Sequence, residues 1–280
     1  MHDFDLLVAH SIAELEQMLA GTQGRVLAGG TDLIVFMEAG RLRPPTLIDI
    51  SRLDELRYIR GDALSIRIGP LTSHSQIVQS PLLQEWAAVL PMAAATVGAV
   101  QIRNRGTIGG NLGTASPAGD TIPALMALSA GVTLRSVRAE RQVALDQFFL
   151  GPGRTVMAPD EYIAEIWFPT PPRAARGVYL KAGRRKAQAI SLVSVGVQLT
   201  LEDGRVKSAR LALGAVAPTV MRAAAAEQAL AGQRLTPDLC RQVAGIAAGE
   251  ARPIGDMRAS ADYRRTLVQT WVRRALETCL

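Results

Sequence analysis

Two glycine-paired segments, eighty residues apart, constrain most strongly how this chain folds. Gly29-Gly30 follows a short apolar run, and Gly109-Gly110 lies in a second stretch that also carries threonine and serine. Paired glycines permit positive φ and leave room for backbone amides to approach a ligand, as in main-chain nests that bind phosphate oxygens. Glycine pairs after strands are also ordinary tight turns. The pattern therefore predicts either two turns or a clamp for the two phosphates of a dinucleotide.

The motifs that would specify other chemistry are missing. The chain has no G-x-G-x-x-G after a strand and no G-x-x-x-x-G-K-[ST], which excludes the Rossmann and P-loop mechanisms by motif. Its three histidines are scattered, and Cys240 and Cys279 are too few for a four-cysteine metal site. We expect no catalytic residue and no metal ligand in this chain.

Composition is that of a folded globular protein with one to three domains. The 280 residues are 48% hydrophobic and carry 31 basic against 25 acidic side chains, and nearly all of the basic ones are arginines. This excess suits an anionic cofactor, an acidic partner surface or nucleic acid, and codon bias alone also explains it. Aromatic residues are only 4%, which argues against nucleic-acid binding. We expect a cytoplasmic protein without membrane insertion, because the sequence has few cysteines, no signal-peptide pattern and no run of roughly 20 apolar residues.

Apolar periodicity predicts that the first 170 residues or so mix strands with helices. Ser11 and Glu14 form a capping-box pattern that predicts a helix over about 11–20. Ser51 is expected to cap a short helical turn, and Asp120 to begin another helix. The residues from 98 to 113 are expected to form a glycine-dense loop. The other expected elements are strands over 25–28, 46–50, 64–69, 132–135 and 162–168, and one helical period over 82–90.

The last third has a different pattern, separated by the proline-rich stretch 169–172. A strand over 190–201 reaches Asp203-Gly204, a favoured two-residue hairpin turn, and 206–213 returns. Two helices that begin after Thr236 and Ser260 are expected to cover this hairpin. The proline stretch is therefore the expected domain boundary.

Read in full, the chain resembles the FAD-binding (medium) subunits of molybdenum hydroxylases, the family that contains xanthine dehydrogenase and carbon monoxide dehydrogenase. The resemblance covers essentially the whole chain, including residues 179–185. It rests on Ala28-Gly29-Gly30-Thr31-Asp32-Leu33, Leu47-Ile48-Asp49-Ile50, Arg103-Asn104, Thr107-Ile108-Gly109-Gly110-Asn111, Ala115-Ser116-Pro117 and Asp120.

This resemblance implies an α+β fold. A two-part FAD-binding domain of the vanillyl-alcohol-oxidase/PCMH type would occupy residues 1–172, with subdomains of about 1–55 and 56–172. A smaller C-terminal α+β domain, with helices on an antiparallel sheet, would occupy 173–280.

The resemblance also implies which residues bind FAD. The first segment would wrap the pyrophosphate, and the second would complete the cradle. Asp120 would accept hydrogen bonds from a ribose hydroxyl of the adenosine part, or it would cap the helix that it begins. Ile163, Tyr179 and Lys181 would lie against the cofactor, although each also fits a core or surface role. The implied set is Leu27, Ala28, Gly29, Gly30, Thr31, Asp32, Leu33, Ile34, Thr107, Ile108, Gly109, Gly110, Asn111, Thr114, Asp120, Ile163, Tyr179 and Lys181.

The implied function is electron transfer within a heterotrimer. A large molybdenum-cofactor subunit would oxidise the substrate, a small 2Fe-2S subunit would relay electrons to FAD on this chain, and NAD, a quinone or another acceptor would receive them. The two cysteines cannot hold an iron-sulfur cluster, so that relay must come from a partner. The alternative is a stand-alone FAD-dependent oxidoreductase, which would need an acid/base pair or a flavin attachment residue near the glycine segments.

Overall fold

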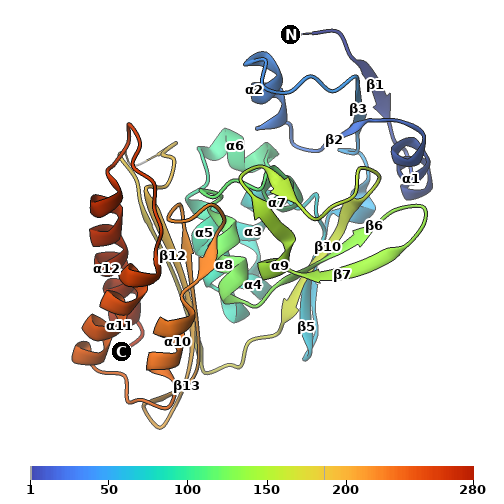
Figure 1. Cartoon of the computed structure of the whole chain (residues 1–280). Helices are drawn as coiled ribbons and strands as arrows, with labels where there is room; N and C mark the ends of the chain where they lie inside the picture. Colours follow the sequence, from blue (N-terminus) through green and yellow to red (C-terminus); the bar gives the residue numbers. More distant parts are fainter. Residues whose placement is uncertain (1, 186) are drawn as a thin grey trace.

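The computed structural model describes residues 2–185 and 187–280 (Figure 1). Its N-terminal part is a parallel sheet of order β1-β3-β2. Leu15 and Leu19 of α1 pack with Ile48 of β3 in a small core of their own. The strands are β1 (Asp5–Val8), β2 (Arg25–Leu27) and β3 (Thr46–Asp49), and the helices are α1 (Ile12–Gly21) and α2 (Leu33–Glu38).

The middle of the chain is an antiparallel sheet of order β4-β5-β10-β6-β7 with short helices beside it. Its central strand, β10 (Tyr162–Pro169), pairs with β5 and β6 from earlier in the sequence, so this part of the fold extends to residue 169. The other strands are β4 (Ile59–Gly61), β5 (Ser65–Ile68), β6 (Gly131–Arg135), β7 (Glu140–Ala144), β8 (Phe149–Gly151) and β9 (Arg154–Thr155). The helices are the 3-10 helix η1 (Asp54–Leu56), α3 (His74–Gln79), α4 (Pro81–Trp86), α5 (Val89–Ala95), α6 (Val100–Arg105), α7 (Ile108–Thr114), α8 (Thr121–Ala127) and α9 (Leu145–Phe148).

The C-terminal part is an antiparallel sheet of order β11-β12-β13-β14 that is covered on both faces. In Figure 1, α11 and α12 lie against one face, and α5 and α8 of the middle part pack on the other. The sheet therefore joins the two parts of the chain. Its strands are β11 (Ala175–Ala182), β12 (Val193–Glu202), β13 (Arg205–Gly214) and β14 (Met221–Arg222), and its own helices are α10 (Ala224–Leu230), α11 (Pro237–Glu250) and α12 (Ala261–Glu277).

Several local predictions are confirmed. Asp203 and Gly204 connect β12 to β13 with φ of +51° and +74°, as a type I′ hairpin turn requires. Thr236 and Ser260 cap α11 and α12 through their hydroxyls. The Ser11 hydroxyl accepts from the Glu14 amide, but the Glu14 carboxylate accepts from the amide of His10 rather than that of Ser11. The first helix thus begins as predicted with a modified capping box.

Other local predictions are wrong. The stretch 98–113 is not a loop, because Thr107 caps α7, and Ile108 and Leu112, one turn apart, face the core. Ser51 caps no helical turn: its amide donates to Asp49 Oδ1, and η1 begins only at Asp54. The single helical period over 82–90 is split between α4 and α5 at residues 87–88. The strand expected from residue 190 begins at Val193, after Gln188 with φ +52°.

No helix within the described residues is both long and apolar enough to cross a bilayer.

The contact between the C-terminal sheet and α8 allows no side chain on β12 at residue 196. A Cβ on Gly196 would lie 2.6 Å from the carbonyl oxygen of Pro123. The partner atom is backbone and cannot rotate away, so the two layers would have to separate. We predict that Gly196→Ala lowers the free energy of unfolding by about 1–3 kcal/mol, measured by urea denaturation.

The matched control is Gly245→Ala in α11, where an added Cβ meets nothing within 4 Å. It should stabilise the protein by about 0.5–1 kcal/mol, because alanine is the better helix former. Equal stability of the wild type and Gly196→Ala would contradict the described contact.

Candidate functional site

The first glycine segment turns the chain from β2 into α2. Gly30 has φ +74°, a conformation that side chains disfavour, and its carbonyl accepts from the amide of Ile34. A Cβ on Gly29 would lie 2.1 Å from the carbonyl oxygen of Arg105. The backbone at Gly29 is therefore pressed against the C-terminal end of α6.

The amides of this segment have no acceptor within the protein. Among the described residues, the N–H groups of Gly29, Gly30, Thr31 and Asp32 donate to no backbone or side-chain atom. Consecutive amides left open in a glycine turn form a concave site for an anion. The segment has the donors that a phosphate group needs.

The second glycine segment begins α7 and is held by the middle part of the chain. The Thr107 hydroxyl accepts from the Gly110 amide at 3.1 Å, and the amides of Ile108 and Gly109 donate to the carbonyls of Thr72 and Pro70. A Cβ on Gly109 would lie 2.5 Å from Pro70. Helix α7 can sit this close only because residue 109 is glycine.

The structure brings the two segments together. The Thr114 hydroxyl donates to Asp32 Oδ2 at 2.9 Å, which links the end of α7 to the start of α2. At the junction of α6 and α7, a Cβ on Gly106 would have Thr31 Oγ1 at 3.3 Å and the His74 ring at 3.2 Å. Residues eighty positions apart thus form one continuous site, which we call the glycine cradle: residues 27–34, 106–111 and 114.

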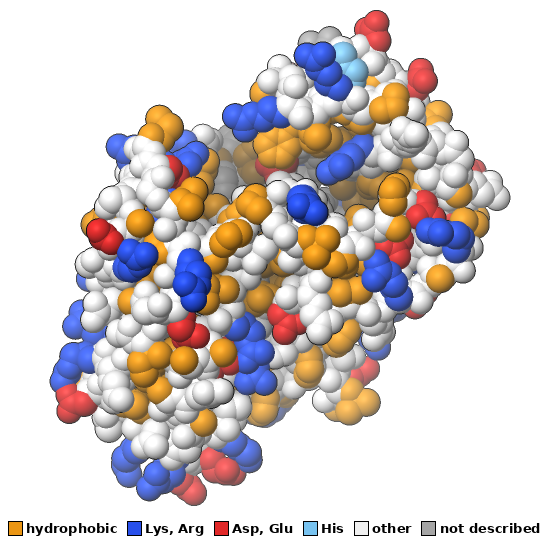
Figure 2. Space-filling view, in the orientation of Figure 1, with side chains coloured by type: hydrophobic (Ala, Val, Ile, Leu, Met, Phe, Trp, Pro, Cys, Tyr) orange, Lys and Arg blue, Asp and Glu red, His pale blue; other side chains and the backbone are white. Residues whose placement is uncertain are grey.

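A cavity of about 520 Å³ adjoins the cradle, and we call it the first cavity. Figure 2 shows the surface hollowed between the N-terminal sheet and the rest of the molecule. The wall of the first cavity is largely apolar, with Asp49 and Arg105 as its charged groups. It is lined by residues 27–31, Ile34, Val35, Asp49, Ser51, Gln101, Ile102 and Arg105.

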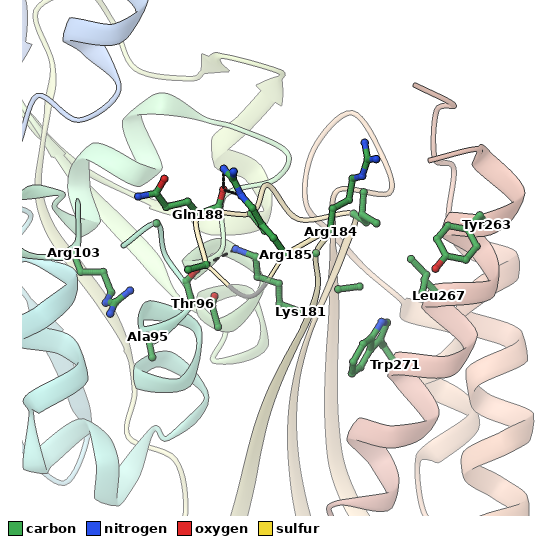
Figure 3. Close-up of a pocket in the computed structure, with 16 residues that line it drawn as sticks. Ala95, Thr96, Arg103, Lys181, Arg184, Arg185, Gln188, Tyr263, Leu267 and Trp271 are labelled. Carbon is green, nitrogen blue, oxygen red and sulfur yellow. Dashed lines mark hydrogen bonds between the residues drawn. The ribbon is translucent and has the colours of Figure 1, made fainter. Parts of the chain in front are cut away.

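A second cavity, of about 740 Å³, lies between the middle part and α12 (Figure 3). Thr96, Arg103 and Lys181 lie on one side, and Leu267 and Trp271 of α12 face them from the other. The connection 183–189, between β11 and β12, also lines it. Helix α6 contributes Ile102 and Arg105 to the first cavity and Arg103 to the second, so the two cavities are neighbours.

A buried ionic network forms one end of the second cavity. Asp120 Oδ2 accepts from Lys181 Nζ at 2.6 Å, and its Oδ1 accepts from the hydroxyls of Ser191 at 2.6 Å and Tyr179 at 3.2 Å. Lys181 Nζ also donates to the carbonyl of Thr96. Burial raises the pKa of Asp120, while Lys181 and the two hydroxyls oppose that shift. Burial and the neighbouring Asp120 raise the pKa of Tyr179 well above its ordinary range, so this phenol stays protonated.

The remaining residues that were predicted to bind the cofactor lie in different environments. Asp120 does not cap α8: its side chain makes no cap hydrogen bond and is directed to Lys181, Ser191 and Tyr179 instead. Ile163 lies in the main core on β10, and neither it nor buried Tyr179 is among the residues that line the first or the second cavity. Within the cradle, Leu33 begins α2, and the Asn111 side-chain oxygen accepts from Thr121 at the start of α8.

Several residues at these sites are not predicted as site residues from the sequence. Burial, together with Arg103, lowers the pKa of His74 to about 4, so a neutral imidazole lies beside the cradle at Gly106. No spacing in the sequence marks a single histidine for such a place. Arg103, Arg184 and Trp271 line the second cavity, but they come from α6, a connection and α12. Only the tertiary fold reveals that they converge.

Comparisons with known proteins match this architecture along nearly the whole chain. Residues 2–171 match the family described as the FAD binding domain in molybdopterin dehydrogenase, and residues 178–279 match the CO dehydrogenase flavoprotein C-terminal domain. Similar curated proteins include the nicotine 6-hydroxylase medium subunit of Paenarthrobacter nicotinovorans, 32% identical over 90% of this chain and 88% of the relative. Another is the nicotinate dehydrogenase FAD-subunit of Eubacterium barkeri, 33% identical over 96% and 93%.

Solved structures give the same result. A chain of carbon monoxide dehydrogenase from Hydrogenophaga pseudoflava superposes with a TM-score of 0.95 at 32% identity, covering 99% of this chain and 97% of that one. A chain of quinoline 2-oxidoreductase from Pseudomonas putida 86 gives 0.94 at 26% identity, with coverage of 99% and 97%. The expected α+β fold, with a flavin domain followed by a smaller C-terminal domain, is confirmed.

Substitution of Gly29 tests the cradle. Gly29→Ala would place a methyl group against the Arg105 carbonyl and force the two segments apart, so we predict at least a tenfold loss of FAD affinity, about 1.4 kcal/mol. Flavin release during dialysis, followed by fluorescence, measures it.

Gly113→Ala is the control, because Gly113 lies in α7 and its added Cβ would meet nothing within 4 Å. That variant should retain flavin. Equal flavin retention by both variants would refute the close contact between the segments.

The Asp120–Lys181 pair gives a second test. Asp120→Asn leaves a buried ammonium without its counter-charge, so we predict a loss of about 3 kcal/mol in the free energy of unfolding. Lys181→Met in the same chain should recover part of that loss, since it removes the unpaired charge. Urea denaturation of the wild type, Asp120→Asn, Lys181→Met and the double variant completes a double-mutant cycle. Additive effects of the two substitutions on the free energy of unfolding would contradict a direct ion pair.

Proposed function

The chain belongs to the family of FAD-binding medium subunits of molybdenum hydroxylases, and we propose that it passes electrons from a 2Fe-2S partner subunit through its FAD to an acceptor. Its homologues are flavoprotein subunits of dehydrogenases and hydroxylases, so it is an oxidoreductase subunit with FAD as its cofactor. Bound FAD supplies the redox chemistry, and the protein supplies binding, orientation and electrostatics.

The row of open amides at residues 29–32 carries this proposal. A dinucleotide pyrophosphate is an anion with several acceptor oxygens, and these four N–H groups have no acceptor among residues 2–185 and 187–280. Arg105, which lines the adjoining first cavity together with Asp49, supplies one positive charge beside this row of amides. The residues present therefore fit FAD.

We assign the remaining contacts to the same cofactor. Residues 27–34 would hold the pyrophosphate through the open amides of residues 29–32. Residues 107–111 with Thr114 would complete the cradle on the other side, where the amides of 108–111 already donate within the protein and Thr114 holds Asp32 in place. Within the described part of the chain, Asp120 Oδ2 accepts from Lys181 and from no other donor, which leaves it a lone pair for a ribose hydroxyl. Lys181 lines the second cavity, and the Tyr179 hydroxyl donates a hydrogen bond to Asp120 Oδ1. Ile163 lies in the core on β10, and we assign its backbone to the same cofactor.

The names of the similar proteins indicate which partner subunits this chain would have. Proteins named as medium subunits or medium chains are similar over almost their full length, so we propose a large molybdenum-cofactor subunit and a small 2Fe-2S subunit as partners in a heterotrimer. We propose residues 1–172 as the FAD-binding domain and 173–280 as the C-terminal domain. Cys240 and Cys279 are free and buried, which fits a reducing compartment such as the cytoplasm.

Expression of the chain alone, and then with its small partner, tests this function. The isolated chain should be yellow with one releasable FAD and should not oxidise a substrate by itself. Addition of the reduced 2Fe-2S subunit without oxygen should bleach the flavin absorbance band. Substrate oxidation by the isolated chain would favour a stand-alone oxidoreductase, and a folded chain that takes up no FAD would refute the proposal.

A further inference from the structure

One buried arginine of the C-terminal part connects several segments near the proposed FAD site. Arg264 lies in the first turn of α12, is 4% exposed, and is not among the residues that line the first or the second cavity. Its Nη1 donates to the carbonyls of Leu192 at 2.8 Å and Ala215 at 3.0 Å. Its Nη2 donates to Asp256 Oδ1 at 3.0 Å. The guanidinium therefore ties three separate segments to the start of α12, with the charge pairing and hydrogen bonds that a buried cation needs.

Asp256 holds this guanidinium from a tight turn. Its Oδ1 also accepts from the amides of Arg258 at 2.9 Å and Ala259 at 3.2 Å, and its Oδ2 accepts from the Arg258 side chain at 3.0 Å. The Arg258 amide and the Arg264 guanidinium hold the pKa of Asp256 well below its usual range, so this carboxylate is charged at neutral pH. The fork of Arg264 is thus fixed on one side by an anchored negative charge.

The other two segments lead to Asp120. Leu192 precedes β12 and follows Ser191, whose hydroxyl donates to Asp120 Oδ1 at 2.6 Å. Ala215 follows β13, and its amide donates to the carbonyl of Pro117 at 2.8 Å, in the segment that leads into Asp120. The guanidinium therefore acts on Asp120 by two routes, both from the open end of the β12–β13 hairpin.

Both routes contain strained backbone. Ala215 has φ +63°, and Gln188, in the connection before Leu192, has φ +52°. Side chains disfavour this left-handed conformation, and residues persist in it only where surrounding contacts hold them. The Arg264 bonds to the carbonyls of Leu192 and Ala215 are contacts of that kind.

We propose that Arg264 is a positioning residue of the FAD site, and that it orients Asp120 through Ser191 and Pro117. The inference rests on the function proposed above, in which Asp120 Oδ2 meets a ribose hydroxyl of FAD. Hydroxyl donors occupy Oδ1, so the direction of Oδ2 depends on where these donors and the backbone before Asp120 lie. Because hydrogen bonds weaken steeply when they are misaligned, a loosened Asp120 binds the cofactor less well. Arg264 acts through the protein and touches no cofactor atom itself.

Titration of the flavin-free chain with FAD tests this role. Arg264→Met should weaken FAD binding about tenfold, because Asp120 loses its fixed direction. Arg264→Lys keeps a charge beside Asp256, but its compact ammonium cannot replace the planar fork at all three acceptors, so it should weaken binding less, by about threefold. Quenching of FAD fluorescence on binding measures the dissociation constants.

Arg222→Met is the matched control. Arg222 also pairs with a buried carboxylate of the C-terminal part, Glu227, but that carboxylate bonds to the Leu211 amide and not to the segments around Asp120. The control should lower the free energy of unfolding, measured by urea denaturation, and bind FAD as the wild type does. Weakening of FAD binding by Arg222→Met as large as that by Arg264→Met would make Arg264 a general stabiliser and overturn the inference.

Hydrogen exchange of the flavin-free chain gives a second readout that needs no cofactor. Arg264→Lys should speed exchange at the amides of Leu192 and Ala215, and leave exchange in α10 unchanged. If Arg264→Met does not fold, Arg264→Lys serves for both measurements. Unchanged exchange at these two amides, or FAD affinity in the Arg264 variants equal to that of the wild type, would contradict the positioning role. A wild type that binds no FAD would be a separate result, which refutes the proposed function.

Discussion

The contact between Gly29 and the Arg105 carbonyl is the constraint on which the site depends. It leaves no room for a side chain and brings the first glycine segment against the junction of α6 and α7. Because no acceptor among the described residues pairs with the amides of residues 29–32, these donors stay available. The same junction places α6 between the two cavities, so one close contact arranges the cradle, the first cavity and the second.

The Asp120–Lys181 network joins this site to the C-terminal part. Asp120 precedes α8, whereas Tyr179, Lys181 and Ser191 belong to β11 and the connection before β12. A buried ion pair contributes little net stability, because removing two charges from water costs about as much as their attraction returns. Its better-supported role is geometric: with the Gly196 contact to Pro123, it fixes how the C-terminal sheet lies against the flavin domain.

The parts of this structure that follow from local chemistry could be predicted from the sequence. The Asp203-Gly204 turn and the caps at Thr236 and Ser260 depend on residues within one turn of each other. The prediction of a loop over 98–113 is wrong because glycine content favours a loop, while the Thr107 cap and the burial of Ile108 and Leu112 outweigh glycine's low helix propensity.

The candidate site could be predicted only in part, because its side chains come from distant parts of the sequence. The two glycine segments are visible as motifs, and their resemblance to a family indicates FAD. Which side chains converge on Asp120, and that Arg103, Arg184 and Trp271 share a cavity, depends on contacts between residues that are scores of positions apart. The most direct measurement is an experimental structure of the FAD-loaded chain. We expect diphosphate oxygens within hydrogen-bond distance of the amides of residues 29–32, and a diphosphate bound elsewhere would contradict the role of the glycine cradle.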